Sequence, residues 1–286
     1  MGGTPLKILV TGANGQLGHD ILLNLAARGI DRIPADIAEF DITQAAATEQ
    51  FIAAHQPDAV IHCAAYTAVD KAEDDAELCR LINATGTENI AHACKKANSK
   101  MVYISTDYVF PGTGDTPYET TAQTAPLSTY GKTKLGGEEA VTQLLTRYFI
   151  VRTSWVFGKN GNNFVKTMLR LGKEREEVSV VCDQIGSPTY TVDLARLLVD
   201  MALSEQYGVY HATNEGFCSW AEFAQAIFRK AGLSARVNFI TTDQYPVRAH
   251  RPLNSRLSKA SLNDAGFHRL FPWEDALERF LAEIAT

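Results

Sequence analysis

Two residues that could transfer a proton together stand four positions apart. Tyr130 and Lys134 frame the segment Tyr-Gly-Lys-Thr-Lys, and on a helix residues at this spacing share one face. A tyrosine has an ordinary pKa of about 10, and a neighbouring ammonium should lower it by stabilising the phenolate. Such a tyrosine could give its proton to a carbonyl oxygen while a hydride reaches the carbon. We take both residues as catalytic candidates, although a bare pair at this spacing is more often a solvated helix face.

A glycine-rich segment near the start predicts a binding site for the diphosphate of a dinucleotide. It follows residues 6–11, an apolar run that predicts a buried strand. Gly12 would allow a tight turn, Gly15 a close approach of the backbone to phosphate, and Gly18 close packing of the following helix. The free N–H groups of that helix would face the phosphates. The spacing is GxxGxxG rather than GxGxxG, so the inference rests on the position between strand and helix.

Two polar segments follow expected strands and are further site candidates. Asp36 directly follows the strand expected at residues 33–35. A carboxylate at this strand end can accept hydrogen bonds from the adenosine ribose hydroxyls and disfavours a 2′-phosphate. Arg32 lies near but precedes that strand, and strand-end aspartates are often merely solvated, so the choice between NADH and NADPH stays open. Ser105-Thr106-Asp107 lies at the end of the strand expected at residues 100–105, the sheet edge where ligands of open α/β sheets bind.

Short apolar strands alternate with helices through the first half of the chain. This alternation predicts an α/β fold of Rossmann type, with a doubly wound parallel sheet. The strands are expected at residues 6–11, 33–35, 59–63, 100–105 and 148–153, and the helices at residues 20–28, 43–55, 76–97 and 133–145. Thr43 is the expected N-cap of the second helix. His62, on a buried strand, is expected to be a core histidine with its hydrogen bonds satisfied.

The alternation ends after about Trp155. We therefore expect residues 1–157 to form a dinucleotide-binding domain, and residues 158–286 to form mainly a smaller C-terminal substrate-binding lobe with some segments returning to the first domain. Expected elements of the lobe are helices at 164–173, 193–204 and 219–231 and a strand at 178–181. Ser219 and Glu222 have the spacing of a capping box. The Pro- and Arg-rich residues 241–257 are expected to be irregular.

The composition excludes several classes of function. The 286 residues carry a formal net charge of −6, without the basic patch expected of a nucleic-acid-binding protein. The sequence contains no apolar run of the ~18 residues that span a bilayer and no signal-peptide pattern at its start. Five scattered cysteines without a CxxC pair argue against disulfides and zinc. A cytoplasmic protein without membrane or nucleic-acid partners is expected.

Four further segments carry a family resemblance. They are Ala64–Asp70 (AAYTAVD), Ser105–Phe110 (STDYVF), Arg152–Val156 (RTSWV) and Arg251–Leu257 (RPLNSRL). With the glycine loop and the Tyr-Lys pair, they resemble the dTDP-4-dehydrorhamnose reductase family of the extended short-chain dehydrogenase/reductases, from about Lys7 to the C-terminal helix. The resemblance implies that NADPH or NADH reduces the C4 ketone of dTDP-4-dehydro-L-rhamnose to dTDP-L-rhamnose, a precursor of cell-surface polysaccharide.

The resemblance also assigns roles to individual residues. Tyr130 would donate the proton, Lys134 would hold the nicotinamide ribose and tune Tyr130, and Thr106 would bind the substrate carbonyl. The cofactor residues would further include Gly12, Asn14, Gly15, Gln16, Leu17, Gly18, Asp36, Asp41, Ile42, Ala64 and Ala65. The dTDP-sugar would contact Val69, Asp107, Tyr108, Trp155 and Arg251, and Arg256 could also meet its diphosphate. By sequence alone Trp155 would more often be a core residue, and the arginines would be surface groups as often as ligands.

A metal site is not expected. Some members of the family are described with a divalent ion at a dimer contact, bound partly by an acidic residue of the glycine loop. Gln16 occupies that position here, and a neutral amide is a poor ligand for Mg²⁺. A homodimer is left open.

Two other functions remain as alternatives. Sugar-nucleotide dehydratases place a glutamate where this chain has Tyr108, which cannot replace a carboxylate near neutral pH, and epimerases return the hydride to the substrate. A non-catalytic NADP-binding regulatory subunit is the other alternative, since fold alone does not decide function. The presence of Thr106, Tyr130 and Lys134 together favours catalysis.

Overall fold

The largest sheet of the protein has six parallel strands in the order β10-β5-β4-β3-β1-β2. The computed structural model describes residues 6–285. The strands are β1 (Lys7–Thr11), β2 (Asp31–Ala35), β3 (Ala59–His62), β4 (Lys100–Thr106), β5 (Tyr148–Thr153) and β10 (Gly208–His211). The predicted α/β class and doubly wound parallel sheet are confirmed.

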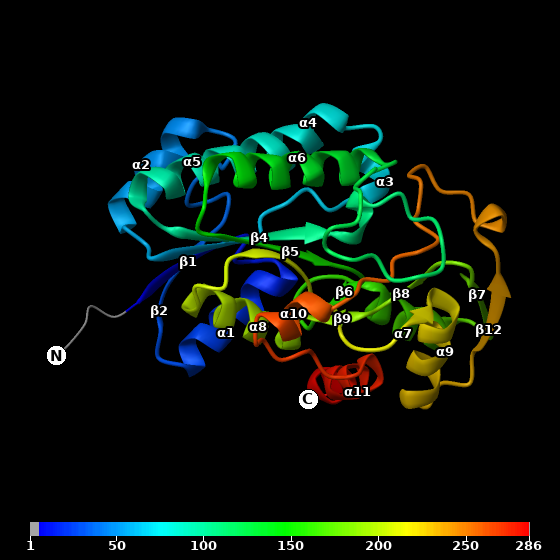
Figure 1. The fold of residues 1–286 in the computed structure, drawn as a ribbon. Helices are drawn as coiled ribbons and strands as arrows, with labels where there is room; N and C mark the ends of the chain where they lie inside the picture. The colour runs from blue at the N-terminus through cyan, green and yellow to red at the C-terminus, as the bar shows by residue number, and fades with distance from the viewer. Residues whose placement is uncertain (1–5, 286) are drawn as a thin grey trace.

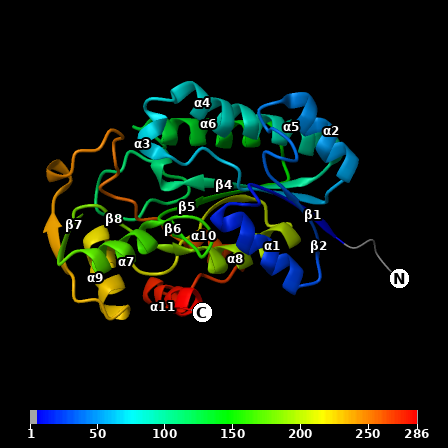
Figure 2. The ribbon, with the colours of Figure 1, turned by 180° about the vertical axis from the view of Figure 1, so that it is seen from behind.

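Helices cover both faces of this sheet (Figures 1 and 2). One layer holds α1 (Gln16–Ala27) and α8 (Thr191–Leu203), and the other holds α2 (Ala45–His55), α5 (Thr87–Ala97) and α6 (Thr129–Leu144). Successive strand residues serve opposite layers. Ile8 and Val10 of β1 join the core under α1 and α8, whereas Leu9 joins the core under α2 and α5. Burial on both faces explains why the central strands β1 and β3 are mostly apolar, whereas the edge strand β2 is largely exposed and carries Asp31 and Arg32.

Three helix starts differ from the sequence-based expectation. Helix α1 begins at Gln16 rather than at residue 20, directly after Gly15. Helix α2 begins at Ala45 without a side-chain cap, so the prediction of Thr43 as N-cap was wrong; the Thr43 hydroxyl donates to Asp41 instead. Helix α6 begins at Thr129 rather than at residue 133, because the Ser128 hydroxyl caps it by accepting from the N–H of Gly131. Tyr130 therefore lies in the first turn of α6.

The long helix expected at residues 76–97 is interrupted. It consists of α4 (Ala76–Arg80), a π-helical stretch η1 (Leu81–Gly86) and α5. The π-helical stretch contains Asn83, which is 1% exposed and whose amide bonds to both backbone groups of Tyr66. Single-turn π segments inside helices often occur at functional sites, and this one supports a segment that follows β3.

A second group of elements packs beyond the end of the sheet. It comprises β6 (Val156–Phe157), α7 (Phe164–Glu174), β7 (Glu177–Val181), β8 (Ile185–Gly186), β9 (Thr189–Tyr190), β11 (Cys218–Ser219), α9 (Trp220–Lys230), β12 (Arg236–Ile240) and α11 (Trp273–Ala285). Phe157, Phe223 and Phe280 lie in its core. Ser219 and Glu222 form the predicted capping box of α9. Residues 241–257 are irregular apart from η3 (Thr242–Gln244), as expected.

Two elements that follow residue 157 are part of the first domain: strand β10 extends its sheet and helix α8 packs on one face of it. Strand β10 pairs in parallel with β5, and α8 packs against α1. Local sequence patterns do not identify either segment as part of the first domain. Within residues 6–285, no helix has both the length and the apolar character needed to cross a bilayer.

Candidate active site

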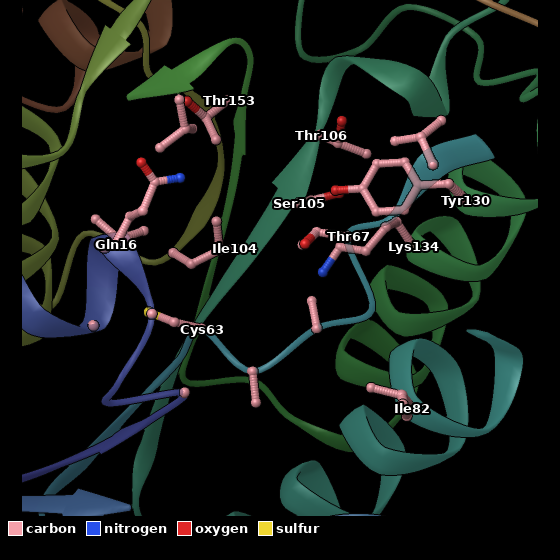
Figure 3. A pocket seen from close by; sticks show the side chains of 18 of the residues that line it. Gln16, Cys63, Thr67, Ile82, Ile104, Ser105, Thr106, Tyr130, Lys134 and Thr153 are labelled. Carbon is pink, nitrogen blue, oxygen red and sulfur yellow. The ribbon is translucent and has the colours of Figure 1, made fainter. Parts of the chain in front are cut away.

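A cleft of about 1180 Å³ opens at the carboxyl ends of the central strands. The glycine loop and Gln16 lie on one side of it, and Thr106, Tyr130 and Lys134 on the other (Figure 3). Residues of the second group, including Trp155, Gln184 and Trp220, also line it. Ligand sites of open α/β sheets occupy this edge, and the volume exceeds the ~300–1,000 Å³ typical of drug-sized ligands. The cleft can therefore hold more than one small molecule.

The glycine loop forms a cradle that side chains would fill. Gly12 has φ +64°, and a Cβ there would lie 2.7 Å from the backbone nitrogen of Ala64. A Cβ on Gly18 would lie 2.2 Å from the carbonyl oxygen of Gly12. Helix α1 starts at the loop without a side-chain cap, and its first residues, Gln16 and Leu17, line the cleft, so its N-terminus is available to a ligand. These features fit the diphosphate of a dinucleotide.

Asp36 lines the cleft on the same side as the glycine loop, at the end of β2. Its carboxylate accepts a hydrogen bond from the backbone N–H of Asn14 at 3.0 Å and a second one from Ile37. These bonds fix the carboxylate at the end of β2, where an adenosine ribose would lie. The cofactor candidates that line the cleft are Gly12, Gly15, Gln16, Leu17, Gly18, Asp36, Asp41, Ile42, Ala64, Ala65, Tyr130 and Lys134. Asn14 is exposed and does not line it.

The three catalytic candidates come from two elements. Tyr130 and Lys134 lie on α6, and Thr106 ends β4. The Thr106 hydroxyl donates to Asp107 at 2.9 Å and accepts from the N–H of Tyr108, capping the short helix η2 (Asp107–Val109). The ammonium of Lys134 lies 4.2 Å from the centre of the Tyr103 ring. The structure brings all three candidates to one wall of the cleft (Figure 3).

Burial dominates the acid–base properties of this wall. It raises the pKa of Tyr130 above its ordinary value, with a smaller contribution from the charge of Asp107 and an opposing contact with Thr106. The Tyr130 pKa is therefore raised overall, and the expectation of a lowered pKa was wrong. Burial also lowers the pKa of Lys134 to about 7, against the opposing charge of Glu138. Tyr130 therefore keeps its proton at neutral pH, as a donor must, while Lys134 titrates near neutrality.

The candidate sugar pocket lies beside Tyr130. Val69, Asp107, Tyr108 and Trp155 line the cleft, and the rings of Tyr108 and Tyr130 meet edge to face at 5.5 Å. Burial raises the pKa of Asp107 to about 6, opposed chiefly by Ser255 and Thr106, and its Oδ2 has no hydrogen-bond partner among the described residues. A buried polar atom without a partner is costly, and a ligand donor could satisfy it.

The two candidate arginines do not line the cleft. Arg251 donates to the Tyr108 hydroxyl at 3.2 Å and pairs with Asp70 of α3 (Val69–Ala72) at 2.6 Å. It thus lies one side chain behind the cleft wall. The guanidinium of Arg256 donates to Asn254, and Arg256 does not line the cleft although its neighbour Ser255 does.

Trp155 takes an unusual conformation for a bulky residue. Its φ is +50°, and its ring stacks on Trp220 with centres 3.7 Å apart. Gly186 makes room for this ring, since a Cβ there would lie 2.9 Å from the indole. Strained conformations of this kind cluster at functional sites. Trp155 is half-buried and lines the cleft, so the alternative interpretation of Trp155 as a core residue was wrong.

Several cleft residues were not singled out from the sequence. They include Thr153, Ser154, Trp220 and Ser255. Thr153, Ser154 and Ser255 stand inside segments that carried the family resemblance, so their positions could have been found there. Trp220 opens an ordinary amphipathic helix, and nothing in its pattern marks it.

Gln16 and His62 both have structural partners. The side-chain oxygen of Gln16 accepts from the N–H of Gly158 and from the amide of Asn163, joining the glycine loop to the start of α7. His62 bonds to Thr11 and Thr87 through its two ring nitrogens and is 1% exposed, as expected of a core histidine. Residues 6–285 contain no cluster of three or more His, Cys, Asp or Glu side chains arranged to hold a metal.

The fold and the cleft together define an extended short-chain dehydrogenase/reductase, an oxidoreductase class that combines a glycine cradle with a Tyr-x-x-x-Lys pair. The family described as RmlD substrate binding domain matches residues 6–286. The dTDP-4-dehydrorhamnose reductase of Salmonella typhimurium is 41% identical over 98% of this chain and 99% of its own. SpsK, a spore coat polysaccharide biosynthesis protein of Bacillus subtilis, is 40% identical over 97% of each chain.

Solved structures agree with these relatives. A dTDP-4-dehydrorhamnose reductase from Bacillus anthracis, in complex with NADP, has a TM-score of 0.96 and 45% identity over 98% of this chain and 100% of its own. An ortholog from Clostridium acetobutylicum has the same TM-score at 43% identity, with the same coverage. This chain belongs to the dTDP-4-dehydrorhamnose reductase family.

Proposed function

We propose that this chain reduces the C4 ketone of dTDP-4-dehydro-L-rhamnose to dTDP-L-rhamnose with NADPH or NADH. The observation that carries the proposal is the convergence of Thr106, Tyr130 and Lys134 on one cleft wall, facing a glycine cradle. The relatives named as dTDP-4-dehydrorhamnose reductases match this chain over nearly its whole length. The Bacillus anthracis relative in complex with NADP supports the kind of cofactor.

Each residue of the cleft has a separate role in the proposed reduction. A bound reduced nicotinamide supplies the hydride for the ketone carbon. Tyr130 donates its proton to the ketone oxygen, which Thr106 orients through its hydroxyl. Lys134 holds the ribose next to the nicotinamide and, as an ammonium, favours the phenolate that Tyr130 leaves behind. The cradle of Gly12, Gly15 and Gly18 receives the diphosphate, and Asp36 receives the adenosine ribose.

The sugar pocket would use a different set of side chains. Val69, Asp107, Tyr108 and Trp155 would bind the dTDP-sugar, and Arg251 would act through its bond to the Tyr108 hydroxyl. We further propose that residues 1–157 are mainly the cofactor-binding part and residues 158–286 mainly the substrate-binding part. A cytoplasmic enzyme, a homodimeric assembly and a role in cell-surface polysaccharide synthesis belong to the same proposal. The SpsK relative supports the polysaccharide role.

The test is an assay of nicotinamide oxidation with purified protein and dTDP-4-dehydro-L-rhamnose. We expect turnover that requires the sugar nucleotide, yields dTDP-L-rhamnose and persists after dialysis against EDTA, because the tyrosine supplies the proton without a metal. Tightly bound NAD with no net oxidation would indicate an epimerase instead. Binding of cofactor with no turnover of any sugar nucleotide would indicate a regulatory subunit. A rate that collapses in EDTA and returns with Mg²⁺ would contradict the metal-free chemistry.

A further inference from the structure

A buried ion pair lies directly behind Lys134. Glu138 of α6 and Arg152 of β5 pair at 2.7 Å, with side chains only 5% and 6% exposed. The guanidinium makes two bonds to the carboxylate, one to each oxygen, at 2.9 and 2.7 Å. The Ser105 hydroxyl of β4 donates to the same carboxylate. Two strands, β4 and β5, therefore supply partners to Glu138 of α6.

Glu138 stands four residues after Lys134 on the same helix. Side chains at this spacing lie on one face, and both point toward the sheet and are buried. Ser105 directly precedes Thr106, so the bond from Ser105 to Glu138 also connects the carboxylate to the strand end that carries a catalytic candidate. A buried ion pair is weak evidence for stability, because desolvation offsets its Coulomb energy. Its position next to the catalytic wall calls for another explanation.

The other groups around Lys134 cannot supply a negative charge. Burial raises the pKa of the Cys63 thiol to about 12 and raises that of Cys79. It also raises the pKa of Tyr103, whose ring faces the ammonium, and that of Tyr130 on its own helix. His62 on β3 stays neutral because burial lowers its pKa to about 3.

Among the groups of residues 6–285 that act on Lys134, Glu138 is thus the one anion near neutral pH. Arg152 carries the opposite charge and bonds to that carboxylate through two nitrogens. The ammonium of Lys134 has lost most of its water, and a desolvated ammonium is readily deprotonated unless an opposite charge lies close.

We propose that Glu138, held by Ser105 and Arg152, is a positioning residue whose carboxylate, buried one turn from Lys134 on the same face of α6, stabilises the ammonium form of that side chain. This inference deepens the proposed function, on which its kinetic part rests. Removing the carboxylate charge makes the ammonium less stable. Activity that depends on the ammonium is then lost at a lower pH, so the alkaline limb of the pH profile moves toward acid.

The first test uses Glu138→Gln, which keeps the shape of the side chain and removes its charge. This variant leaves Arg152 buried without a partner and could fail to fold, so the second variant is Glu138→Gln combined with Arg152→Met, which removes both charges. Glu138→Asp keeps the charge. The structural control removes another ion pair that has a buried carboxylate, with Asp193→Asn and Arg279→Met. Asp193 is 3% exposed and lies on α8, away from Lys134.

Two measurements are made on each folded variant. The pH profile of kcat should show its alkaline limb lowered by on the order of one pH unit in Glu138→Gln. The shift should be in the same direction but smaller in the double variant, because that variant also removes the Arg152 cation. The limb should be unchanged in Glu138→Asp and in the Asp193 control, in which only the melting temperature falls. Independently of substrate, an NMR titration of labelled lysine, with the Lys134 signal assigned by its loss in Lys134→Arg, should show the same downward shift.

The outcomes separate the inference from the proposed function. Absence of turnover by the unmodified protein would reject the proposed function, while the NMR titration would still test Glu138. Unchanged Lys134 titration in folded Glu138→Gln, or in the double variant if only that variant folds, would overturn the inference even if activity were lower at every pH, because a purely structural role predicts a uniform loss.

Discussion

At the residue scale, Tyr130 presents its proton to the cleft from the first turn of α6. Burial raises its pKa, so the hydroxyl is protonated at neutral pH and has the proton that reduction of a ketone consumes. Phosphate and ribose contacts would come from other residues. The chemical step and the binding of the cofactor can therefore be separated by one substitution.

Tyr130→Phe should remove most of the activity and leave cofactor binding nearly intact. The phenyl ring preserves the edge-to-face contact with Tyr108 but has no proton to donate. General acid catalysis contributes about 10²–10⁴-fold, and kcat should fall by that factor. Stopped-flow kinetics would give kcat, and titration of nicotinamide fluorescence would give the cofactor Kd. Near-normal turnover would reject Tyr130 as the proton donor.

Asp36→Ala should shift cofactor preference toward NADPH. The Asp36 carboxylate is fixed by Asn14 at the expected ribose site, and within residues 6–285 the one basic residue lining the cleft is Lys134 on the opposite wall. Loss of a charged hydrogen-bond acceptor should raise the NADPH to NADH ratio of kcat/KM by about tenfold. Glu39→Gln, which removes a nearby charge outside the cleft, should leave that ratio unchanged. If NADPH supports turnover of the unmodified protein and NADH gives none, the assignment of Asp36 to the adenosine ribose site is wrong.

At the scale of elements, the π-helical stretch η1 links two cleft walls. Asn83 accepts from the N–H of Tyr66 at 2.8 Å and donates to its carbonyl at 3.1 Å. The same amide donates to Thr133 of α6 at 3.2 Å. Tyr66 directly follows Ala64 and Ala65, which line the cofactor half. One buried amide therefore holds the segment after β3 against the helix that carries Tyr130.

Asn83→Leu should lower both stability and cofactor affinity. The substitution leaves the two backbone groups of Tyr66 without their partner, at a cost of about 2–4 kcal/mol in the free energy of unfolding. Chemical denaturation and the cofactor Kd are the measurements. Thr133→Val is the matched control, because it removes the bond on the α6 side and keeps both bonds to Tyr66. Equal loss of cofactor affinity in the two variants would contradict this role for Asn83.

Local patterns predicted the elements that carry the cofactor chemistry. A strand, three glycines and a helix are adjacent in sequence, so the cradle at Gly12, Gly15 and Gly18 could be inferred before the structure. Tyr130 and Lys134 were found in the same way, because their relation is a helical spacing. The start of α6 was placed too late, since the cap by Ser128 depends on its hydroxyl reaching Gly131.

Features that depend on distant contacts were not predictable. Strand β10 joins the sheet by pairing with β5, far earlier in the chain, and its short sequence reads as part of the second half. The left-handed conformation of Trp155 needs the space at Gly186 and the stacked ring of Trp220. The raised pKa of Tyr130 likewise follows from burial by the assembled cleft, which spacing along a helix does not reveal.

At the scale of the whole molecule, burial of histidines couples folding to pH. His62 lies between Thr11 and Thr87, and burial, with a smaller contribution from Lys134, lowers its pKa to about 3. His211 is also fully buried, and burial lowers its pKa to about 3 as well. Between pH 3 and the ordinary histidine pKa of about 6.5, the unfolded chain binds protons that the folded chain does not. Stability must therefore fall as the pH falls through this window.

His62→Gln should make stability less sensitive to acid. Each pH unit below about 6.5 costs a neutral buried histidine about 1.4 kcal/mol of stability, so at pH 5 the cost for His62 is about 2 kcal/mol. Glutamine does not titrate, and its amide can still bond to the two threonines. Between pH 7 and pH 5, the free energy of unfolding of the original protein should therefore fall by about 2 kcal/mol more than that of the variant. Urea denaturation at the two pH values measures both. His92→Gln, at a half-exposed position on α5, should leave the pH dependence unchanged. Parallel stability curves for the original protein and His62→Gln would show that His62 is protonated in the folded state, against its burial between two hydroxyls.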